Sequence, residues 1–403
     1  MEDQGKALLE QASLNAFGVP EITSADLYAL LEKPSDLFLL DVRNDEDYAS
    51  WKIEGRCLPE TMHIFYGEFI ENVEQAAQMV PEGRQVVVVC AKGGASSYVA
   101  EELRNRRQIP AVNLAGGMAA WGNHYETRLA AKGESFALYQ VARVARGCLS
   151  HVLVSEGQAA IIDPLRHADP YQRLLVETGA RLAGIFDTHA HADHISGGPA
   201  LAVETGAPYH LHPYDAIHPF DILPGRLAYQ MMYDGQVFEI GKLTLEVIHV
   251  PGHTLGQVNF LVREPGGSTF TFTGDNIFIQ SFGRPDLGGQ AVSWAPLVYE
   301  SIFSTLKKRL PAETVVFPGH FSQHQEANEA GVFAGRLAEL WEKNTDLLYS
   351  DRESFIRHVM SHLPEMPSQY VQIKRVNTGL HIPDEDEASE LELGKNVCAL
   401  SMD

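Results

Sequence analysis

Short apolar runs alternate with helical patterns over residues 22–122. The runs 37–42 (LFLLDV) and 85–90 (QVVVVC) are almost continuously apolar, which is typical of buried parallel strands. Residues 96–107 (SSYVAEELRNRR) have the pattern of a helix, and residues 111–117 (AVNLAGG) that of a further strand and turn. This alternation predicts a small α/β domain of about 100 residues.

The pattern changes from residue 136 onward, where strand-like runs dominate. They are FALYQVA, HVLVSEG, QAAIIDP, GIFDTH, LTLEVIHVPGH, NFLV, TFTFTGD and TVVFPGH, with a helical stretch at 169–180. Several of these runs end in a histidine or an aspartate. Because sites in α/β proteins are commonly built at strand ends and in the loops that follow, we expect the chemistry of this second α/β domain there.

The predicted domain limits follow these changes of pattern. We expect an N-terminal helical segment over 1–21, the first domain over 22–125, a polar linker over 126–135 and the second domain over 136–343. Residues 344–403 begin with helical patterns and include the acidic stretch 382–394. We expect this part to be a helical extension with a solvated tail.

Composition and charge narrow the range of partners. With 403 residues the chain is long enough for two domains, and a net charge of −22 argues against nucleic acid or an anionic membrane as partner. No run approaches the ~18 apolar residues of a membrane span, and the acidic N-terminus lacks the layout of a secretory signal. We therefore expect a cytoplasmic protein. The four cysteines are far apart and form no CxxC pair, which argues against a zinc knuckle or a disulfide framework.

A cluster of metal-capable side chains lies in the stretch DTHAHADH, residues 187–194. Any one of these histidines could be an ordinary polar loop residue, but four such side chains within six positions favour a metal site. Three later strand ends supply further candidates. The whole set is His189, His191, Asp193 and His194, followed by His253 in VPGHT, Asp275 in FTGD and His320 in FPGH.

The motifs THAHADH, PGHT, TGD and PGH, in this order, resemble those of the metallo-β-lactamase superfamily. The resemblance implies an αββα sandwich, with two sheets face to face and helices outside, over about 136–343. In the dinuclear hydrolases of that superfamily, the positions of His189, His191 and His253 bind one metal. The positions of Asp193, His194 and His320 bind the other, and that of Asp275 bridges the two.

A narrower resemblance competes with the dinuclear one. The stretches RGCLSHVLV, DTHAHADHISG and FTGDNIFIQSFGRPDLGG resemble persulfide dioxygenases, which are related to glyoxalase II. This implies one Fe(II) per chain, held by His189, His253 and Asp275 as an open facial triad. The other four motif residues, His191, Asp193, His194 and His320, would orient ligands or protonate intermediates. Arg284 and Asp286 match a stretch near the metal, although an ordinary loop salt bridge would explain this pair equally well.

A second candidate site is the loop that follows Cys90. Backbone N–H groups and a helix N-terminus would point at the sulfur and favour a thiolate or persulfide, although a buried inert thiol fits the loop alone equally well. The flanking stretches LLDVRNDEDYASWKIEG and NLAGGMAAW resemble rhodanese sulfurtransferases, which implies that Cys90 carries a sulfane sulfur. Ala95 stands where many rhodaneses have an arginine, leaving Lys92 as the loop's only cation. The expected cradle is Ala91, Lys92, Gly93, Gly94, Ala95 and Ser96.

These resemblances favour an enzyme that oxidises a small thiol persulfide with O₂ to sulfite and passes sulfane sulfur through Cys90. The alternative is a dinuclear zinc hydrolase of the glyoxalase II or thioesterase type with an accessory rhodanese domain. A third hypothesis is a non-catalytic persulfide sensor or carrier. The sequence does not decide the metal, the thiol, the direction of sulfur transfer or the placement of the two sites, and it is compatible with a homo-oligomer.

Overall fold

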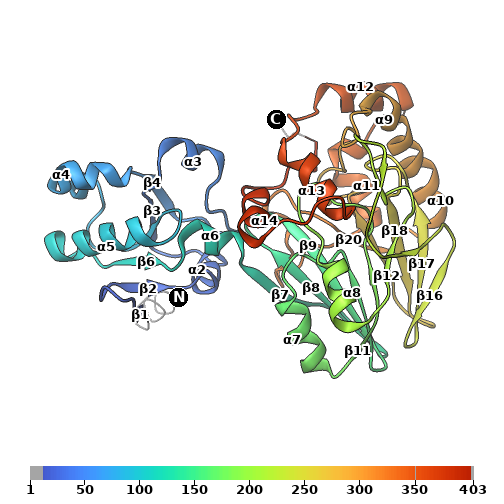
Figure 1. Cartoon of the computed structure of the whole chain (residues 1–403), viewed down its shortest axis with the longest axis horizontal. Helices are drawn as coiled ribbons and strands as arrows, with labels where there is room; N and C mark the ends of the chain where they lie inside the picture. Colours follow the sequence, from blue (N-terminus) through green and yellow to red (C-terminus); the bar gives the residue numbers. More distant parts are fainter. Residues whose placement is uncertain (1–11, 350, 401–403) are drawn as a thin grey trace. The chain divides into compact units, whose positions relative to one another are not determined.

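The computed structural model describes residues 12–349 and 351–400. The chain divides into two compact units, which are described separately (Figure 1). The first unit comprises the chain up to residue 126 together with 143–146, and the second comprises 127–142 and the chain from 147 onward. The mixed α/β class expected for both domains is therefore present.

The first unit is built on a six-stranded sheet with the order β1-β2-β6-β5-β3-β4. All neighbouring pairs in it are parallel except β1 with β2. The strands are β1 (Ser13–Leu14), β2 (Pro20–Ile22), β3 (Leu37–Asp41), β4 (Glu60–His63), β5 (Gln85–Val89) and β6 (Ala111–Leu114), and the helices are α2 (Ser24–Leu31), α3 (Asp45–Ser50), α4 (Tyr66–Gln78), α5 (Gly94–Arg107) and α6 (Gly117–Gly122).

Helices α4 and α5 cover one face of this sheet. Phe69 of α4 and Leu103 of α5 pack with Phe38, Val86 and Val88 of the central strands in one buried cluster. Figure 1 shows the two helices side by side along the sheet. The central strands β3 and β5 are continuously apolar because both of their faces are buried.

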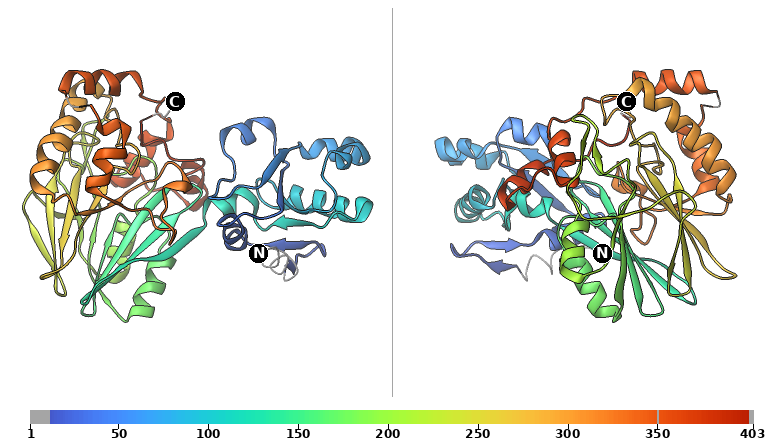
Figure 2. Two further views of the ribbon diagram at one scale, coloured as in Figure 1. Left: turned by 180° about the vertical axis from the view of Figure 1, so that it is seen from behind. Right: turned by 45° about the vertical axis from the view of Figure 1, so that its right-hand side comes forward.

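The second unit contains two main sheets and a separate two-stranded hairpin (Figure 2). One has seven strands in the order β15-β12-β11-β10-β9-β8-β7, and the other has six in the order β16-β17-β18-β19-β20-β21. The strands are β7 (Tyr125–Lys132), β8 (Phe136–Arg143), β9 (Cys148–Ser155), β10 (Gln158–Ile162), β11 (Arg181–Phe186), β12 (Tyr209–Leu211), β15 (Gln230–Met231), β16 (Val237–Ile240), β17 (Leu243–His249), β18 (Val258–Arg263), β19 (Thr269–Gly274), β20 (Val315–Pro318) and β21 (Gly335–Arg336), with a separate hairpin of β13 (Ile217–His218) and β14 (Leu223–Pro224).

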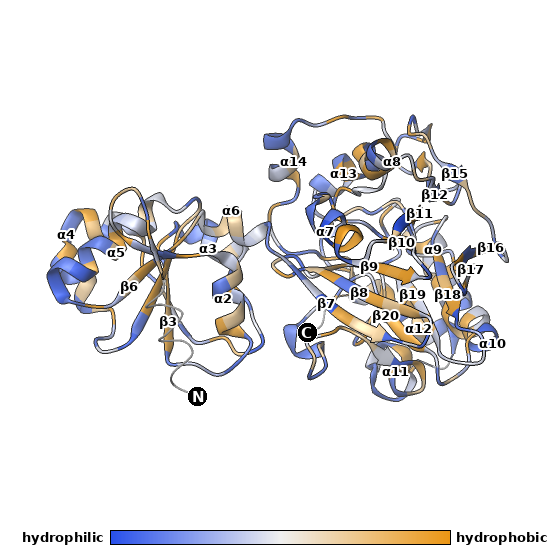
Figure 3. Cartoon of the chain, turned by 90° about the horizontal axis from the view of Figure 1, so that it is seen from below, coloured by the Kyte–Doolittle hydropathy of each residue, from blue (hydrophilic) through white to orange (hydrophobic). Residues whose placement is uncertain are grey.

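Alternating residues of the second sheet face two different cores. Val247 and Phe260 pack between the sheets against Leu153 and Phe186, whereas the adjacent Ile248 belongs to a cluster with the outer helices. This period of two is the signature of strands buried on both sides. The strands at the centre of this unit are correspondingly hydrophobic in Figure 3.

Helices complete the αββα layers. The helical segments are α7 (Asp169–Thr178), α8 (Gly198–Thr205), α9 (Ala291–Tyr299), the π-helical η1 (Glu300–Leu306), α10 (Lys307–Arg309), the short 3₁₀ turns η2 (His324–Glu326) and η3 (Thr345–Leu347), α11 (Leu337–Lys343), α12 (Arg352–Ser361), α13 (Gln369–Asn377) and α14 (Glu385–Leu391). None of the described helices is long and apolar enough to cross a membrane.

Two expectations about segments outside the domains need correction. Residues 1–11 of the expected N-terminal helical segment lie outside the described residues, and the rest of it contains β1 and β2. Gly18 at φ +74° provides the turn, and β2 pairs with β6, so sheet pairing decides this conformation. Most of the expected linker at 126–135 is strand β7. Because β7 lies at the edge of its sheet and is half-exposed, it carries polar residues within an ordered strand, and its polar composition predicted a linker.

The expected solvated tail is also folded in the structure. Helix α14 covers most of the acidic stretch, and its neighbour Glu392 is buried and pairs with Arg166 at 2.7 Å. Cys398 is fully buried beside Phe278 and Tyr370. The many charged residues of this segment predicted that it is solvated. Instead, the ion pair of Glu392 with Arg166 and the apolar contacts of Cys398 hold the segment on the second unit.

Candidate functional site

The histidines and aspartates expected at strand ends converge in the second unit. His189 and His191 follow β11, His253 lies in the loop after β17, Asp275 follows β19 directly, and His320 follows β20. All of them are almost completely buried. Buried polar side chains require partners, so their contacts show what the site can hold.

Three of these residues present unpartnered atoms to one another. The Nε2 atom of His253 lies 3.3 Å from the Oδ2 atom of Asp275, and that of His189 lies 3.8 Å from the same oxygen. None of these three atoms has a hydrogen-bond partner among the residues that the structure describes. Two imidazole nitrogens and a carboxylate oxygen this close together could hold a metal ion, and we call them the candidate metal-binding group.

The other nitrogen of each of these histidines is held by a neighbour. The Nδ1 atom of His253 lies 2.9 Å from the carbonyl oxygen of Arg284, and that of His189 lies 3.0 Å from the hydroxyl of Thr188. Such contacts on the far side of the ring fix its orientation and its tautomer. The two unpartnered Nε2 atoms are therefore the ones left to bind a metal.

The protonation states also suit a metal. Burial lowers the pKa of His253 to about 4 and, together with the neighbouring imidazoles, holds the pKa of His189 well below its usual value. Burial acts to raise the pKa of Asp275, but the charge of His320 and its hydrogen bond to the carboxylate oppose burial and contribute to a lowered pKa. Neutral imidazoles and an ionised carboxylate are the forms that ligate metals.

The remaining motif residues form a hydrogen-bonded network beside this group. His320 lies between two carboxylates, with Nδ1 2.7 Å from Asp275 and Nε2 2.8 Å from Asp193. Asp193 also accepts from the thiol of Cys148 at 3.1 Å and lies 3.2 Å from Nδ1 of His194. Burial opposes protonation of His320, but the two carboxylates raise its pKa well above the usual value. Most of this network is thus satisfied by its own members.

Cys148 is a further member of this network that the sequence motifs did not single out. It is fully buried and joins Asp193, His194 and His320 in a group that could hold a second metal. An isolated bridge between Cys148 and His320 brings the start of β9 to the end of β20. Because this pairing joins segments far apart in the chain, the sequence around the cysteine gave no signal of it.

His191 faces a different partner. Its Nε2 atom lies 3.2 Å from Asp163, which also accepts from the backbone and hydroxyl of Thr188, while its Nδ1 atom has no partner among the described residues. Asp163 itself has φ +50°, a backbone conformation that non-glycine residues rarely adopt. The carboxylate thus orients both the histidine and the start of the metal-site loop.

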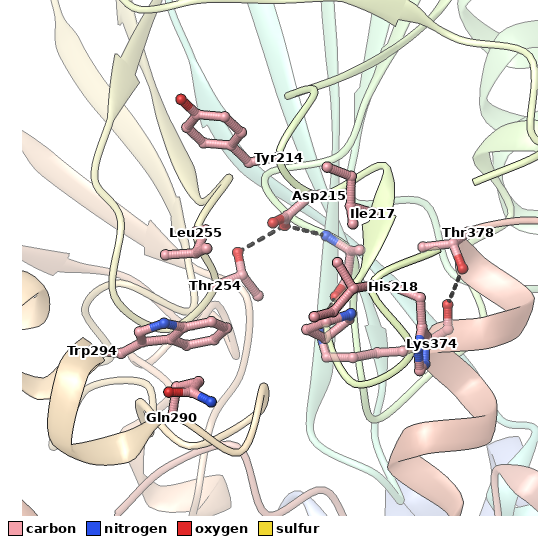
Figure 4. Close-up of a pocket in the computed structure, with 13 residues that line it drawn as sticks. Tyr214, Asp215, Ile217, His218, Thr254, Leu255, Gln290, Trp294, Lys374 and Thr378 are labelled. Carbon is pink, nitrogen blue, oxygen red and sulfur yellow. Dashed lines mark hydrogen bonds between the residues drawn. The ribbon is translucent and has the colours of Figure 1, made fainter. Parts of the chain in front are cut away.

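A second buried carboxylate joins two of the loops. Asp215 accepts from the backbone N–H of Ala190 at 2.7 Å and from the hydroxyl of Thr254 at 2.7 Å (Figure 4), and its other oxygen accepts from the N–H of Gly256 at 2.8 Å. Ala190 and Thr254 directly follow His189 and His253 in the chain. Asp215 therefore fixes the spacing of the two histidines.

Helix α13, from the C-terminal extension, holds the histidine loop by its backbone. The amide of Asn377 donates to the carbonyl oxygens of His191 and His194 at 2.9 and 2.8 Å and accepts from the N–H of Ser196 at 2.9 Å. Lys374, one turn earlier, donates to the carbonyl oxygen of Ala190 at 2.8 Å. Sequence reasoning missed these residues because nothing in a helical pattern reveals a contact made more than 180 positions away.

We expect Asn377→Ala to loosen this loop. Removing the amide leaves buried backbone groups without partners, which costs about 1–3 kcal/mol of unfolding free energy. Loss of an orienting contact of this kind typically weakens metal affinity by about 10–100-fold. Urea unfolding and titration with Fe²⁺ and Zn²⁺ would measure both effects, with the exposed Gln372→Ala on the same helix as control. Unchanged metal affinity would contradict this role.

Arg284 and Asp286 pair with each other. The guanidinium donates to the Asp286 carboxylate at 2.6 and 2.7 Å and to backbone carbonyl oxygens of the C-terminal segment, including that of Val397 at 3.1 Å. Only the backbone carbonyl of Arg284 touches a candidate ligand, His253. The side chains thus match the loop salt bridge that we considered as the alternative, and they anchor the C-terminal segment.

In the first unit, the expected loop surrounds the Cys90 sulfur. The N–H of Gly93 and the hydroxyl of Ser96 lie 3.0 and 3.1 Å from Sγ. Gly93 has φ +90° and precedes α5, so its backbone N–H can turn toward the sulfur. A Cβ on Gly117 would lie 2.2 Å from the Cys90 carbonyl oxygen, so glycine is needed for this close approach. The geometry suits an anionic sulfur.

A cavity of about 360 Å³ opens at this cysteine, lined by Val42, Arg43, Asn44, Asp47, Phe65, Tyr66, Cys90, Ala91, Lys92, Gly94 and Ala95. The guanidinium of Arg43 is bound to Asp41 at 2.7 Å and to the carbonyl oxygen of Asp47 at 3.0 Å, so it stabilises the cavity wall. Lys92 is exposed in the loop. The cation closest to the sulfur in sequence is thus an exposed ammonium that lines the cavity.

Comparison with known families fits both units. Residues 143–320 match the metallo-beta-lactamase superfamily, and residues 23–124 match the rhodanese-like domain. The chain is a metallo-β-lactamase superfamily member with a fused rhodanese-like domain. These matches agree with the two families that the sequence motifs resemble, and the αββα sandwich is the fold expected for the larger one.

Individual relatives include members with different activities. The chain is 31% identical over 176 residues to a hydroxyacylglutathione hydrolase of Cereibacter sphaeroides, covering 43% of this chain and 61% of the relative. It is 33% identical over 165 residues to the human mitochondrial persulfide dioxygenase ETHE1, covering 40% of this chain and 59% of the relative. The chain therefore spans about three fifths of each of these two relatives.

Among solved structures, ETHE1 from Myxococcus xanthus is similar with a TM-score of 0.50 and 26% identity. The match covers 60% of this chain and 98% of that one. Both the hydrolase and the dioxygenase are thus related to the second unit, and the geometry of the metal site has to distinguish the two activities.

Proposed function

We propose that this enzyme oxidises a low-molecular-weight persulfide with O₂ and transfers sulfane sulfur through Cys90. The balanced oxidation is RSSH + O₂ + H₂O → RSH + SO₃²⁻ + 2 H⁺. The observation that carries the proposal is the group of three buried, mutually close and unpartnered atoms on His189, His253 and Asp275. We propose that these residues hold one Fe(II).

The donor set fits this metal. Two imidazoles and one carboxylate on one side leave coordination positions open for other molecules, as in non-haem Fe(II) oxygenases. Bound Fe(II) would supply the redox chemistry with O₂ that protein side chains cannot provide. The contacts of Thr188 and of the Arg284 carbonyl orient the two histidines, and His320 holds Asp275 in place.

Neighbouring residues are arranged to hold protons. The network of Asp193, His194 and His320 keeps a proton shared between imidazoles and carboxylates next to Asp275. Formation of the thiol RSH from the persulfide requires a proton at the departing sulfur. We propose that His320, within this network, is the proton donor nearest to the reacting atoms.

In the rhodanese-like domain, the proposed step is a simple exchange of sulfur. The Cys90 thiolate attacks the outer sulfur of a persulfide, a bond from Sγ to that sulfur forms, and the thiol RSH leaves with the proton. The products Cys90–S–S⁻ and RSH balance the reactants Cys90–S⁻ and RSSH. The N–H of Gly93 would stabilise the anion. The Ser96 hydroxyl, which also lies 2.6 Å from the Asn113 amide oxygen, would add to this when its single proton turns to the sulfur.

A dinuclear zinc hydrolase is the alternative, and one specific observation favours it. Cys148, Asp193, His194 and His320 lie close enough together to bind a second metal, and the Nε2 atom of His194 has no partner among the described residues. A metal-bound hydroxide attacking a thioester would then be the expected chemistry. The hydrogen bonds that already satisfy Asp193 and His320 argue for the single-metal proposal.

Metal analysis combined with oxygen consumption tests the proposal. We expect about one iron per chain after anaerobic loading with Fe²⁺. We also expect O₂ uptake, with sulfite as product, when glutathione persulfide is added. Two zinc ions per chain with hydrolysis of a glutathione thioester would favour the alternative. An iron-loaded protein that consumes no O₂ with any persulfide would contradict the proposed reaction.

A further inference from the structure

A cavity of about 370 Å³ adjoins the candidate metal-binding group in the second unit. Two of its lining residues, Ala190 and Thr254, directly follow His189 and His253 in the chain. Its other lining residues are Tyr214, Asp215, Ile217, His218, Pro219, Ile222, Leu255, Gln290, Trp294, Lys374 and Thr378 (Figure 4). No triad residue lines the cavity, so we take it as the neighbouring space that would receive the organic part of a substrate.

The outer part of the cavity is apolar. Ile217 and Leu255 are partly exposed, whereas the indole of Trp294 is almost buried. Ile222 is 77% exposed and is held at φ +52°, which is a strained backbone conformation for a β-branched residue. An exposed and strained isoleucine at the rim contributes nothing to the core, so a hydrophobic ligand is the natural partner for it.

Lys374 is the one lysine or arginine among the lining residues, and it is only 2% exposed. Its Nζ atom donates to the carbonyl oxygen of Ala190, and no carboxylate among the described residues lies within ion-pair distance of it. An ammonium group has three N–H donors, so two of them are left. Burial lowers the pKa of Lys374, and the carboxylates of Asp215, Asp275 and Asp193 act to raise it from beyond ion-pair distance. An anion at the two remaining donors would give the ammonium direct partners.

The other ionisable groups of the lining are already engaged. Asp215 accepts three hydrogen bonds from the two histidine-bearing loops. His218 lies 3.2 Å from the carbonyl oxygen of Val371 through Nε2, and its Nδ1 accepts from the N–H of Asp221. Arg375, adjacent to Lys374, pairs with Asp221 at 2.8 Å. Among the described lining residues, Lys374 is thus the one with charged N–H donors that are not yet hydrogen-bonded.

We propose that this cavity selects persulfides with an uncharged, apolar organic group, and that Lys374 donates to their anionic sulfur end. This inference rests on the proposed function and names its substrate class. The organic group would contact Trp294, Leu255 and Ile222. Glutathione, by contrast, carries two carboxylates, and the apolar rim offers them no spare cation among its described residues.

Binding of redox-inert anions tests this assignment without turnover. Isothermal titration of the iron-loaded chain with hexane-1-sulfonate and with glutathione sulfonate compares an apolar and a peptidic group on the same anionic head. We expect hexane-1-sulfonate to bind at least about tenfold more tightly. Lys374→Met should weaken that binding by about tenfold or more, the effect of losing a charge-assisted hydrogen bond. Lys374→Arg should retain most of it.

Two further variants guard against misfolding as an explanation. Lys242→Met removes an exposed lysine and should leave binding unchanged. Ile222→Gly relieves the backbone strain at an exposed position, so it should fold well and still weaken hexane-1-sulfonate several-fold. Equal or tighter binding of glutathione sulfonate would overturn the apolar specificity, and unchanged binding by Lys374→Met would overturn the role of the lysine.

Oxygen consumption with hexyl persulfide and glutathione persulfide separates this inference from the proposed reaction. A higher kcat/KM for hexyl persulfide, lost in Lys374→Met mainly through KM, would support both. If neither persulfide causes O₂ uptake while the sulfonates bind as expected, the proposed reaction is overturned and the assignment of the cavity is supported.

Discussion

Asp275→Ala is expected to abolish iron binding and persulfide-dependent O₂ uptake. Asp275 supplies the only carboxylate oxygen of the proposed triad, 3.3 Å from His253 and 3.8 Å from His189. Loss of an orienting residue outside a metal's ligand set costs about 10–100-fold in affinity, so loss of a ligand should cost more than about 100-fold. Metal analysis after iron loading and an oxygen electrode measure the two effects.

The controls for Asp275 separate ligation from folding. Asp275 also contacts His320 at 2.7 Å, so removing it leaves a buried imidazole with one carboxylate fewer. Asp275→Asn keeps an oxygen near that nitrogen but removes the negative charge, and it should lose iron while melting close to the wild type. Asp169→Ala, an exposed carboxylate at the start of α7, should change neither property. Full iron content and full activity in Asp275→Ala would refute the triad.

Cys90→Ser is expected to abolish sulfur transfer and leave O₂ uptake intact. A serine hydroxyl can occupy the same place between Gly93 and Ser96, but it neither ionises at neutral pH nor forms a persulfide. Transfer of sulfane sulfur to cyanide should therefore fall to background. The metal ligands all lie in the other unit, so iron content should not change.

Cys57→Ser is the matched control for this experiment. Cys57 lies in the same unit and is half-buried, and its thiol lies 3.9 Å from the backbone carbonyl oxygen of Glu32. It should keep full sulfur transfer. Loss of both activities in Cys90→Ser would show that the two sites depend on each other and would contradict separable chemistry.

The structure brings together the candidate metal ligands that the sequence motifs singled out, because their signal is local. Each candidate lies at the end of an apolar strand or in the loop after it, and strands of one sheet bring such ends to a common edge. The same reasoning applies to Cys90, whose loop follows β5 and precedes α5. Asp163 directly follows strand β10 in the same way and could have been found by this rule.

Other parts of the site depend on contacts that no local pattern encodes. Cys148 meets Asp193 only because β9 starts beside the end of β20, and Asn377 reaches the histidine loop from a helix near the C-terminus. The linker and the tail were misjudged for a related reason. Polar composition indicates exposure, but an edge strand such as β7 and a buried charge such as Glu392 are polar within an ordered fold.

The hold of helix α13 on the histidine loop sets an order of events during protein synthesis. Lys374 and Asn377 follow the loop residues that they bind by 184 and 183 positions. At about 5–20 residues per second, the ribosome needs roughly 10–40 s to reach them after the loop has been made. During that interval the candidate ligands on the loop lack these backbone hydrogen bonds, so a tightly formed metal site has to wait until helix α13 has been made.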